Sequence, residues 1–186
     1  MATSRDQTLI PTNAVRLAAL GILSESDKRY GELAVEIRNF IARMIGPTLD
    51  VLGTSLELLR HEGLIEPLGR RAGPGQSLTA DTQVRLTDAG REALRELLRG
   101  QLRTPMNDLA RLVVALKLRF LNVLEPEDRR RQIEALIELT TSELARLNDL
   151  RTQRPTGEEV FADWLGQEIA QTEGRLAWYR QLAAKT

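Results

Sequence analysis

The segment GLIEPLGRRAGPGQSLTADTQVRLTDAGR, residues 63–91, has the pattern of two strands joined by a long loop. Residues 64–68 form a short, mainly apolar run, and residues 82–87 alternate polar and apolar side chains as a half-buried strand does. The glycines and prolines between them favour an exposed loop. The segment therefore predicts a β-hairpin with a long connection.

Helices are predicted on both sides of this hairpin. Gly63 suits the end of the preceding helix, and Thr87 or Asp88 suits the N-cap of the following one. Thr12 or Asn13 suits the N-cap of the first helix in the same way. The order helix, helix, helix, strand, loop, strand, helix is the winged-helix arrangement. Apolar residues at helical spacing place these helices at residues 14–24, 30–44, 47–62 and 88–102.

The rest of the chain is predicted to be helical. Thr104 and Pro105 mark the expected domain boundary, and apolar stripes after them predict helices at residues 109–124, 126–153 and 158–184. The fold class is therefore mainly α with a small two-stranded wing. We divide the chain into a flexible N-terminal arm (1–11), a winged helix-turn-helix domain (12–103) and a C-terminal helical dimerisation domain (104–186).

The composition excludes several classes of function. The 186 residues include 26 Lys plus Arg and 26 Asp plus Glu, so the formal net charge is zero and a strongly basic surface is excluded. Cysteine is absent and His61 is the only histidine, which excludes disulfides, thiolate sites and a multi-histidine metal site within one chain. Gly73-Pro74-Gly75 lacks the Lys-Ser/Thr ending of a phosphate-binding loop. We expect no metal, no cofactor and no enzymatic activity.

The sequence also argues against a membrane protein. Residues 1–6 (MATSRD) have no apolar signal core. The longest apolar stretch, residues 112–118, is interrupted by Lys117 and is too short to cross a bilayer. We expect a cytoplasmic protein without a membrane partner.

Several short motifs resemble those of the PadR family of bacterial transcription regulators. Residues 63–66 (GLIE) are similar to the exit of the family's recognition helix, and residues 86–91 (LTDAGR) to its Leu-Thr-x-x-Gly helix start. Residues 17–23 (LAALGIL) and 30–33 (YGEL) resemble its first two helices, and the turn LEPED at 124–128 also fits. The resemblance implies a homodimeric repressor. Its N-terminal winged helix would bind the major groove of double-stranded DNA, and its C-terminal helices would form the dimer.

The expected recognition helix, residues 47–62, departs from the family pattern. A position that is usually aromatic in the family is Gly53 here, and the acids Asp50 and Glu57 on the exposed face would repel phosphates. The wing is more favourable, because residues 67–80 hold two arginines and no acid, and arginine at a wing tip can enter a minor groove. The alternative for each candidate is ordinary solvated surface. The candidate DNA contacts are Lys28, Arg29, Thr48, Thr54, Ser55, Arg60, Arg70 and Arg71.

The C-terminal helices carry broad apolar stripes in a domain of only about 80 residues, which is small to bury them alone. A second copy would cover them, although the stripes could instead pack only within the chain. Trp164 and Trp178 are four helical turns apart and share similar faces, which suits dimer packing or an aromatic effector site at the dimer centre. The candidate dimer contacts are Leu112, Leu116, Ile133, Ile137, Leu144, Leu147, Phe161, Trp164, Leu165, Leu176, Trp178 and Tyr179.

A second hypothesis belongs to a different class of function. The two acids, the missing aromatic residue and the neutral net charge also suit a winged-helix protein-interaction module, or adaptor, with weakened DNA binding. A salt-dependent shift of duplex DNA separates the two hypotheses, because phosphate contacts release counterions. A small-molecule effector or a protein partner is compatible with either.

Overall fold

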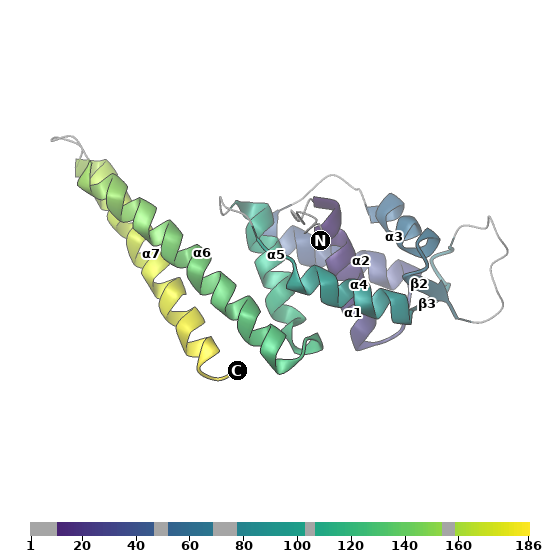
Figure 1. Ribbon diagram of the computed structural model, residues 1–186. Coiled ribbons are helices and arrows are strands. Elements are labelled where there is room, and N and C mark those ends of the chain that lie inside the picture. Colours follow the sequence, from purple (N-terminus) through teal and green to yellow (C-terminus); the bar gives the residue numbers. More distant parts are fainter. Residues whose placement is uncertain (1–10, 47–51, 69–77, 103–106, 154–158) are drawn as a thin grey trace, which may run out of the picture. The chain divides into compact units, whose positions relative to one another are not determined.

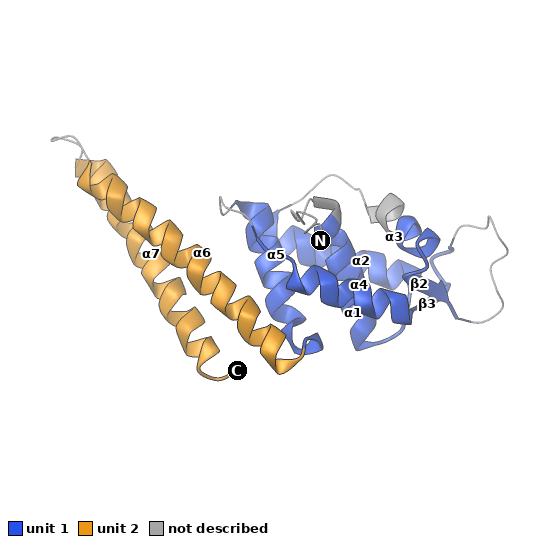
Figure 2. Cartoon of the chain, viewed as in Figure 1, with its two compact units in different colours: residues 1–124 blue, residues 125–186 orange. Residues whose placement is uncertain are grey.

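The computed structural model describes residues 11–46, 52–68, 78–102, 107–153 and 159–186; for Pro11, Thr12 and residues 52–55 only the backbone is described. The chain divides into two compact units, residues 1–124 (unit 1) and 125–186 (unit 2) (Figure 2). No helix among the described residues is both long and apolar enough to span a membrane.

Unit 1 contains the predicted winged-helix elements (Figure 1). Most of the expected helix starts and ends agree within a few residues, although the helix expected at residues 109–124 ends at Arg119 and the expected start of the third helix at residue 47 lies outside the described residues. The first helix already begins at Pro11, so Thr12 and Asn13 lie inside it rather than capping it. In chain order the elements are α1 (Pro11–Glu25), β1 (Lys28–Arg29), α2 (Tyr30–Ile45), α3 (Leu52–His61), β2 (Ile65–Pro67), β3 (Gln83–Leu86), α4 (Asp88–Arg99), α5 (Asp108–Arg119) and the 3-10 helix η1 (Leu121–Val123).

The sheet has three strands rather than the two that we predicted. Its order is β1-β3-β2 and both pairs are antiparallel, with Ile65 opposite Leu86 and Lys28 opposite Val84. Strand β1 was missed because it is only two charged residues long, without any alternation that a pattern could detect. It places the start of α2 directly beside the hairpin.

The core of unit 1 forms around α1, which packs against α2, α3, α4 and α5. Leu112 and Leu116 of α5, which we assigned to a dimer interface, are buried in this core. The largest fully buried side chains are Leu17, Leu20, Ile22, Leu33, Ile37, Leu56, Leu59, Ile65, Leu94, Leu98, Leu112 and Leu116.

Helix α5 therefore belongs with the winged helix, although we placed the boundary before it at Thr104. Its end is fitted closely to α1, because a Cβ at Gly21 would lie 2.3 Å from the ring of Phe120. Only a residue without a side chain allows that ring to approach the backbone so closely. The compact units divide after Leu124.

A buried lysine joins α4 to α5. Lys117 is 3% exposed, and its Nζ donates hydrogen bonds to the carbonyl oxygens of Leu98 and Gly100, the latter at 2.6 Å. These carbonyls lie at the C-terminal end of α4, where helix carbonyls have no partner within the helix. Burial lowers the pKa of Lys117 to about 7.

We expect the stability of unit 1 to rise with pH between 7 and 9. The unfolded chain holds the Lys117 proton up to its ordinary pKa of 10.5, whereas the folded chain releases it near 7. The unfolding free energy should therefore rise by up to about 1.4 kcal/mol per pH unit in this window. Urea denaturation followed by circular dichroism measures it. Lys117→Met should abolish the rise, and an equal rise in that variant would contradict the assignment.

Unit 2 is a helical hairpin of α6 (Pro126–Thr152) and α7 (Glu159–Ala183), which lie side by side (Figure 1). Arg175 of α7 pairs with Glu143 of α6 at 2.8 Å. Among the predicted dimer contacts, Ile137, Leu144, Leu147 and Phe161 are half-buried. The buried residues that hold the hairpin together are Ile133, Leu136, Thr140, Leu165, Ile169, Thr172, Leu176 and Tyr179.

Candidate nucleic-acid interface

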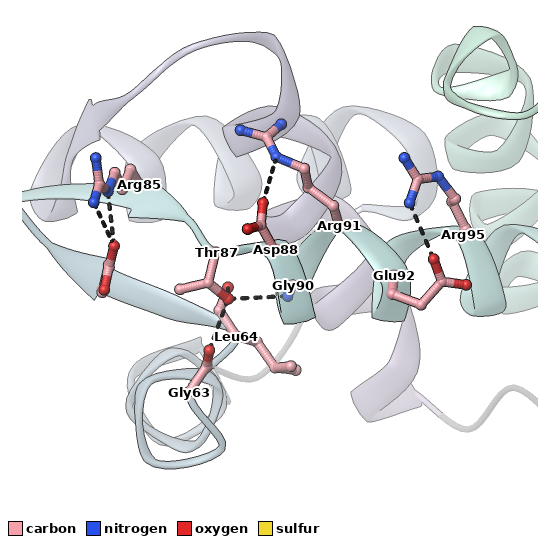
Figure 3. Close-up of polar contacts among 10 residues, drawn as sticks. Gly63, Leu64, Arg85, Thr87, Asp88, Gly90, Arg91, Glu92 and Arg95 are labelled. Carbon is pink, nitrogen blue, oxygen red and sulfur yellow. Dashed lines mark hydrogen bonds and ion pairs between the residues drawn. The ribbon is translucent and has the colours of Figure 1, made fainter.

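One threonine connects the end of α3 to the start of α4 through hydrogen bonds (Figure 3). Gly63 ends α3 in the left-handed region, with φ of 70°. The Thr87 hydroxyl donates to the Gly63 carbonyl oxygen at 2.7 Å and accepts from the Gly90 N–H at 3.0 Å as the N-cap of α4. A Cβ at Gly90 would lie 2.0 Å from the Leu64 carbonyl oxygen. The Leu-Thr-x-x-Gly motif is therefore explained by this turn.

Glu57 is not an exposed acid that faces solvent, as we predicted, but a half-buried one with both carboxylate oxygens in use. Its Oε1 accepts from the backbone N–H of Leu78 at 3.0 Å, and its Oε2 accepts from Arg60 Nε at 2.9 Å. At the end of α3, Glu62 forms a two-point pair with Arg16 of α1, at 2.8 and 2.5 Å. These hydrogen bonds lower the pKa of Glu62. The negative charges at this end of α3 are thus neutralised by arginines of the same unit.

The structure describes some of the predicted DNA contacts. Arg29 is exposed in β1, directly before α2, while Lys28 pairs with Glu36 at 3.1 Å. Arg60 is paired with Glu57, and its side chain is mostly covered. Thr48, Arg70 and Arg71 lie outside the described residues, and for Thr54 and Ser55 only the α3 backbone is described.

A chain of alternating charges connects Lys28 to α5. Arg119 Nη2 pairs with Glu36 and with Glu25, both at 3.0 Å, so Glu36 bridges Lys28 and Arg119. Burial opposes ionisation of Glu36, but hydrogen bonds from Arg119 and Lys28 outweigh it and lower the pKa of this carboxyl. The Arg119 guanidinium also lies 4.9 Å from the ring centre of Phe120. Lys28 is therefore part of an internal network that also includes α1, α2 and α5.

A groove of about 580 Å³ lies beside this network on α2. Its lining includes the ring of Phe40 and exposed Val35, together with Arg43 and Arg119. The groove thus offers apolar surface next to both cations and the acids Glu32 and Glu36. Among the described residues, no group of three or more His, Asp or Glu side chains is placed to hold a metal ion.

Sequence reasoning missed Glu57 and Arg119 as structural centres of unit 1. The partner of Glu57 is a backbone N–H twenty-one positions away, and no side-chain pattern encodes such a contact. Arg119 ends an apolar stripe and is one of many arginines, so its position alone gave no signal. Lys117 did give one, since it is a charge inside an apolar run, and we used it only to argue against a bilayer helix.

The order of elements in unit 1, with α3 leading into a β2–β3 hairpin closed by α4, defines a winged-helix protein. A family model described as "Putative AphA-like transcriptional regulator" matches residues 4–183. The chain belongs to this family of transcriptional regulators. The PadR-like regulator that the motifs predicted is confirmed at this level.

The solved structures that the chain matches include PadR itself. The structure of Bacillus subtilis PadR in complex with operator DNA is 15% identical, covers 92% of this chain and 98% of its own, and superposes with a TM-score of 0.39. The complex of that protein with p-coumaric acid is 14% identical, with coverages of 92% and 98% and a TM-score of 0.37. The structure of smu.1604c from Streptococcus mutans is 18% identical, covers 91% of this chain and 98% of its own, and has a TM-score of 0.39. No curated protein matches significantly.

Proposed function

We propose that this regulator is a cytoplasmic homodimer that binds double-stranded DNA through unit 1 and acts as a repressor. The observation that supports it most directly is the winged-helix geometry of α3, β2, β3 and α4 in a chain of a transcriptional regulator family. In this arrangement α3 enters the major groove and the wing follows the adjacent backbone. No step of this function requires a cofactor or catalysis.

The proposed contacts come from α3, the wing and the start of α2. Exposed Arg29 meets the phosphate backbone, and Thr48, Thr54 and Ser55 supply hydroxyl groups to phosphates or bases. Arg70 and Arg71 of the wing enter the minor groove. Lys28 and Arg60 act less directly, because both are paired with carboxylates of unit 1.

The experiment that tests this function is a mobility shift with the DNA upstream of the protein's own coding region, at two salt concentrations and with nonspecific competitor. We expect a competitor-resistant shift that weakens as salt increases. The adaptor hypothesis predicts no shift at modest salt, and it would then take the place of our proposal. The structure removes one argument for the adaptor hypothesis, because both oxygens of the Glu57 carboxylate accept hydrogen bonds within unit 1.

The wing arginines give the first prediction on DNA binding. Replacing Arg70 and Arg71 together by alanine should lower the affinity on the order of tenfold for every duplex, because phosphate contacts are not sequence-specific. The slope of log affinity against log salt should become shallower by roughly 2. Titrations at four salt concentrations measure both. The control Arg146→Ala with Arg151→Ala removes the same charge from unit 2 and should change neither; an unchanged slope in the wing variant would exclude the wing.

The proposed dimer contact is an exposed stripe on α7. Val160 and Trp178 are separated by eighteen residues, which is five full helical turns, and Trp164 lies close to the same line. These side chains are 85%, 49% and 52% exposed, respectively. The Trp164 ring stacks on Phe161 with ring centres 5.5 Å apart. Large apolar side chains that form one exposed line are typical of a surface that a partner covers.

For a small-molecule effector, we propose the α2 groove. Phe40 and Val35 provide apolar contact there, and Arg119 provides a cation that already donates hydrogen bonds to two carboxylates. A ligand in this groove would contact the network that includes β1, α2 and α5, so it could favour one arrangement of these elements.

A further inference from the structure

Glu57 connects α3 to the segment by which the chain returns from the wing. We call residues 78–82, which precede β3, the return segment. Its first residue, Leu78, is 8% exposed and donates its backbone N–H to Glu57 Oε1 at 3.0 Å. Because Arg60 Nε holds the other carboxylate oxygen at 2.9 Å, the Glu57 side chain is fixed on the α3 surface. This hydrogen bond therefore joins a helix to a segment that is distant in sequence.

The other end of the return segment is fixed to α2. The backbone N–H groups of Tyr30 and Gly31 donate to the carbonyl oxygens of Thr82 and Ala80, both at 2.9 Å. A turn closes between these points, where the Thr82 N–H donates to the Thr79 carbonyl oxygen at 3.0 Å. The return segment is thus held at one end by α2 and at the other by Glu57 of α3.

The surroundings of Glu57 make this contact more than an incidental surface pair. Burial raises the pKa of Tyr30, the charge of Glu57 raises it further, and Arg60 opposes that effect. Tyr30 at the start of α2 therefore lies close to both charged side chains of α3. A hydrogen bond between a backbone N–H and a carboxylate is stronger than a neutral one, particularly where water is partly excluded.

We propose that Glu57 is a positioning residue for DNA binding, which holds the return segment at a fixed place beside α3, at the point where the chain returns from the wing. This inference rests on the proposed DNA-binding function. The inference predicts that removing Glu57 lowers the DNA affinity, whereas charge alone predicts that it raises the affinity. Removing an acid from a helix next to DNA should strengthen DNA binding electrostatically, whereas losing this hydrogen bond should weaken DNA binding by releasing the return segment.

The first arm of the test needs no DNA. Hydrogen exchange of the Leu78 amide is measured in the full-length protein and in the variants Glu57→Ala and Glu57→Gln. We expect Glu57→Ala to speed this exchange by roughly tenfold or more, whereas Glu57→Gln retains an oxygen acceptor and most of the protection. Circular dichroism establishes that both variants are folded. Equal Leu78 exchange in the wild type and Glu57→Ala would overturn the inference, whatever the protein does with DNA.

The second arm measures DNA affinity, with Glu66→Ala as the matched control. Glu66 of β2 is half-buried, and its carboxylate pairs with Arg85 at 2.7 Å, so its removal takes away the same charge without touching the return segment. We expect Glu57→Ala to lower the affinity roughly tenfold, Glu57→Gln to restore most of it, and Glu66→Ala to leave it unchanged or raise it. A rise in affinity for Glu57→Ala, like that of the control, would overturn the proposal.

A double-mutant cycle separates positioning from a general structural effect. In the background of Arg70→Ala with Arg71→Ala, Glu57→Ala should lower the DNA affinity by less than twofold, because the wing contacts that depend on the return segment are already lost. A full tenfold loss in that background would overturn the proposed route through the wing. Failure of the wild type to bind any duplex would overturn the proposed function, while the Leu78 exchange would still decide whether Glu57 holds the return segment.

Discussion

Replacing Trp164 and Trp178 together by glutamate is expected to convert the protein into a monomer. The two indoles are about half exposed on one line of α7, so the charges would enter the proposed dimer contact without disturbing the hairpin core. DNA affinity should fall by at least about 100-fold, because two linked winged helices gain roughly that factor from bivalent binding. Light scattering gives the mass, and a mobility shift gives the affinity.

The control for this experiment uses the same helix. Ala170→Glu with Ala177→Glu adds the same charges at exposed positions of α7 that lie roughly 80° or more around the helix from the tryptophan line. That variant should keep the mass and DNA affinity of the wild type. Circular dichroism should show equal helix content in both variants. A dimer that persists in the Trp164→Glu, Trp178→Glu variant would contradict the proposed contact.

Gly90→Ala should destabilise unit 1 by about 3 kcal/mol, which is the upper range for forcing extra volume into a packed site. The added Cβ would lie 2.0 Å from the Leu64 carbonyl oxygen and 2.7 Å from a methyl carbon of Leu86, so α4 would have to move away from the hairpin. Urea denaturation followed by circular dichroism measures the change. Both tryptophans belong to unit 2, so their fluorescence follows that unit separately.

A second glycine provides the opposite expectation. Gly166 lies within α7 and is exposed, and an added Cβ there would meet nothing within 4 Å. Gly166→Ala should therefore stabilise unit 2 by about 0.5–1 kcal/mol through the better helix propensity of alanine. Similar small effects of both substitutions would show that the Gly90 contact is not close.

Local patterns predicted the helices and the hairpin, because burial of one face leaves an apolar period in the sequence. They did not predict β1, because two charged residues pair with β3 only through their backbone. The compact units divide after Leu124, whereas we expected the domain boundary at Thr104. Which unit α5 joins depends on what Leu112 and Leu116 pack against, and helical spacing does not contain that information.

Candidate DNA contacts were harder to judge than the fold. Residue type identified Arg60 and Lys28 as candidate DNA contacts, yet both have carboxylate partners in unit 1. Glu57 was taken as an exposed acid because its position on α3 suggested it, and its backbone partner comes from beyond the wing. Charge can be counted from a sequence, but whether a charge is available to a ligand depends on long-range packing.

The connection between the two units is short. Phe120 is held against Gly21, Leu124 is buried, and only Leu124 and Glu125 separate η1 from α6. Pro126 further restricts the backbone, because its ring fixes φ. If unit 2 brings two copies together and unit 1 binds DNA, as we propose, only two residues connect each winged helix to the dimer. The range of half-site spacings on DNA that one dimer can bind would then be limited by this short connection.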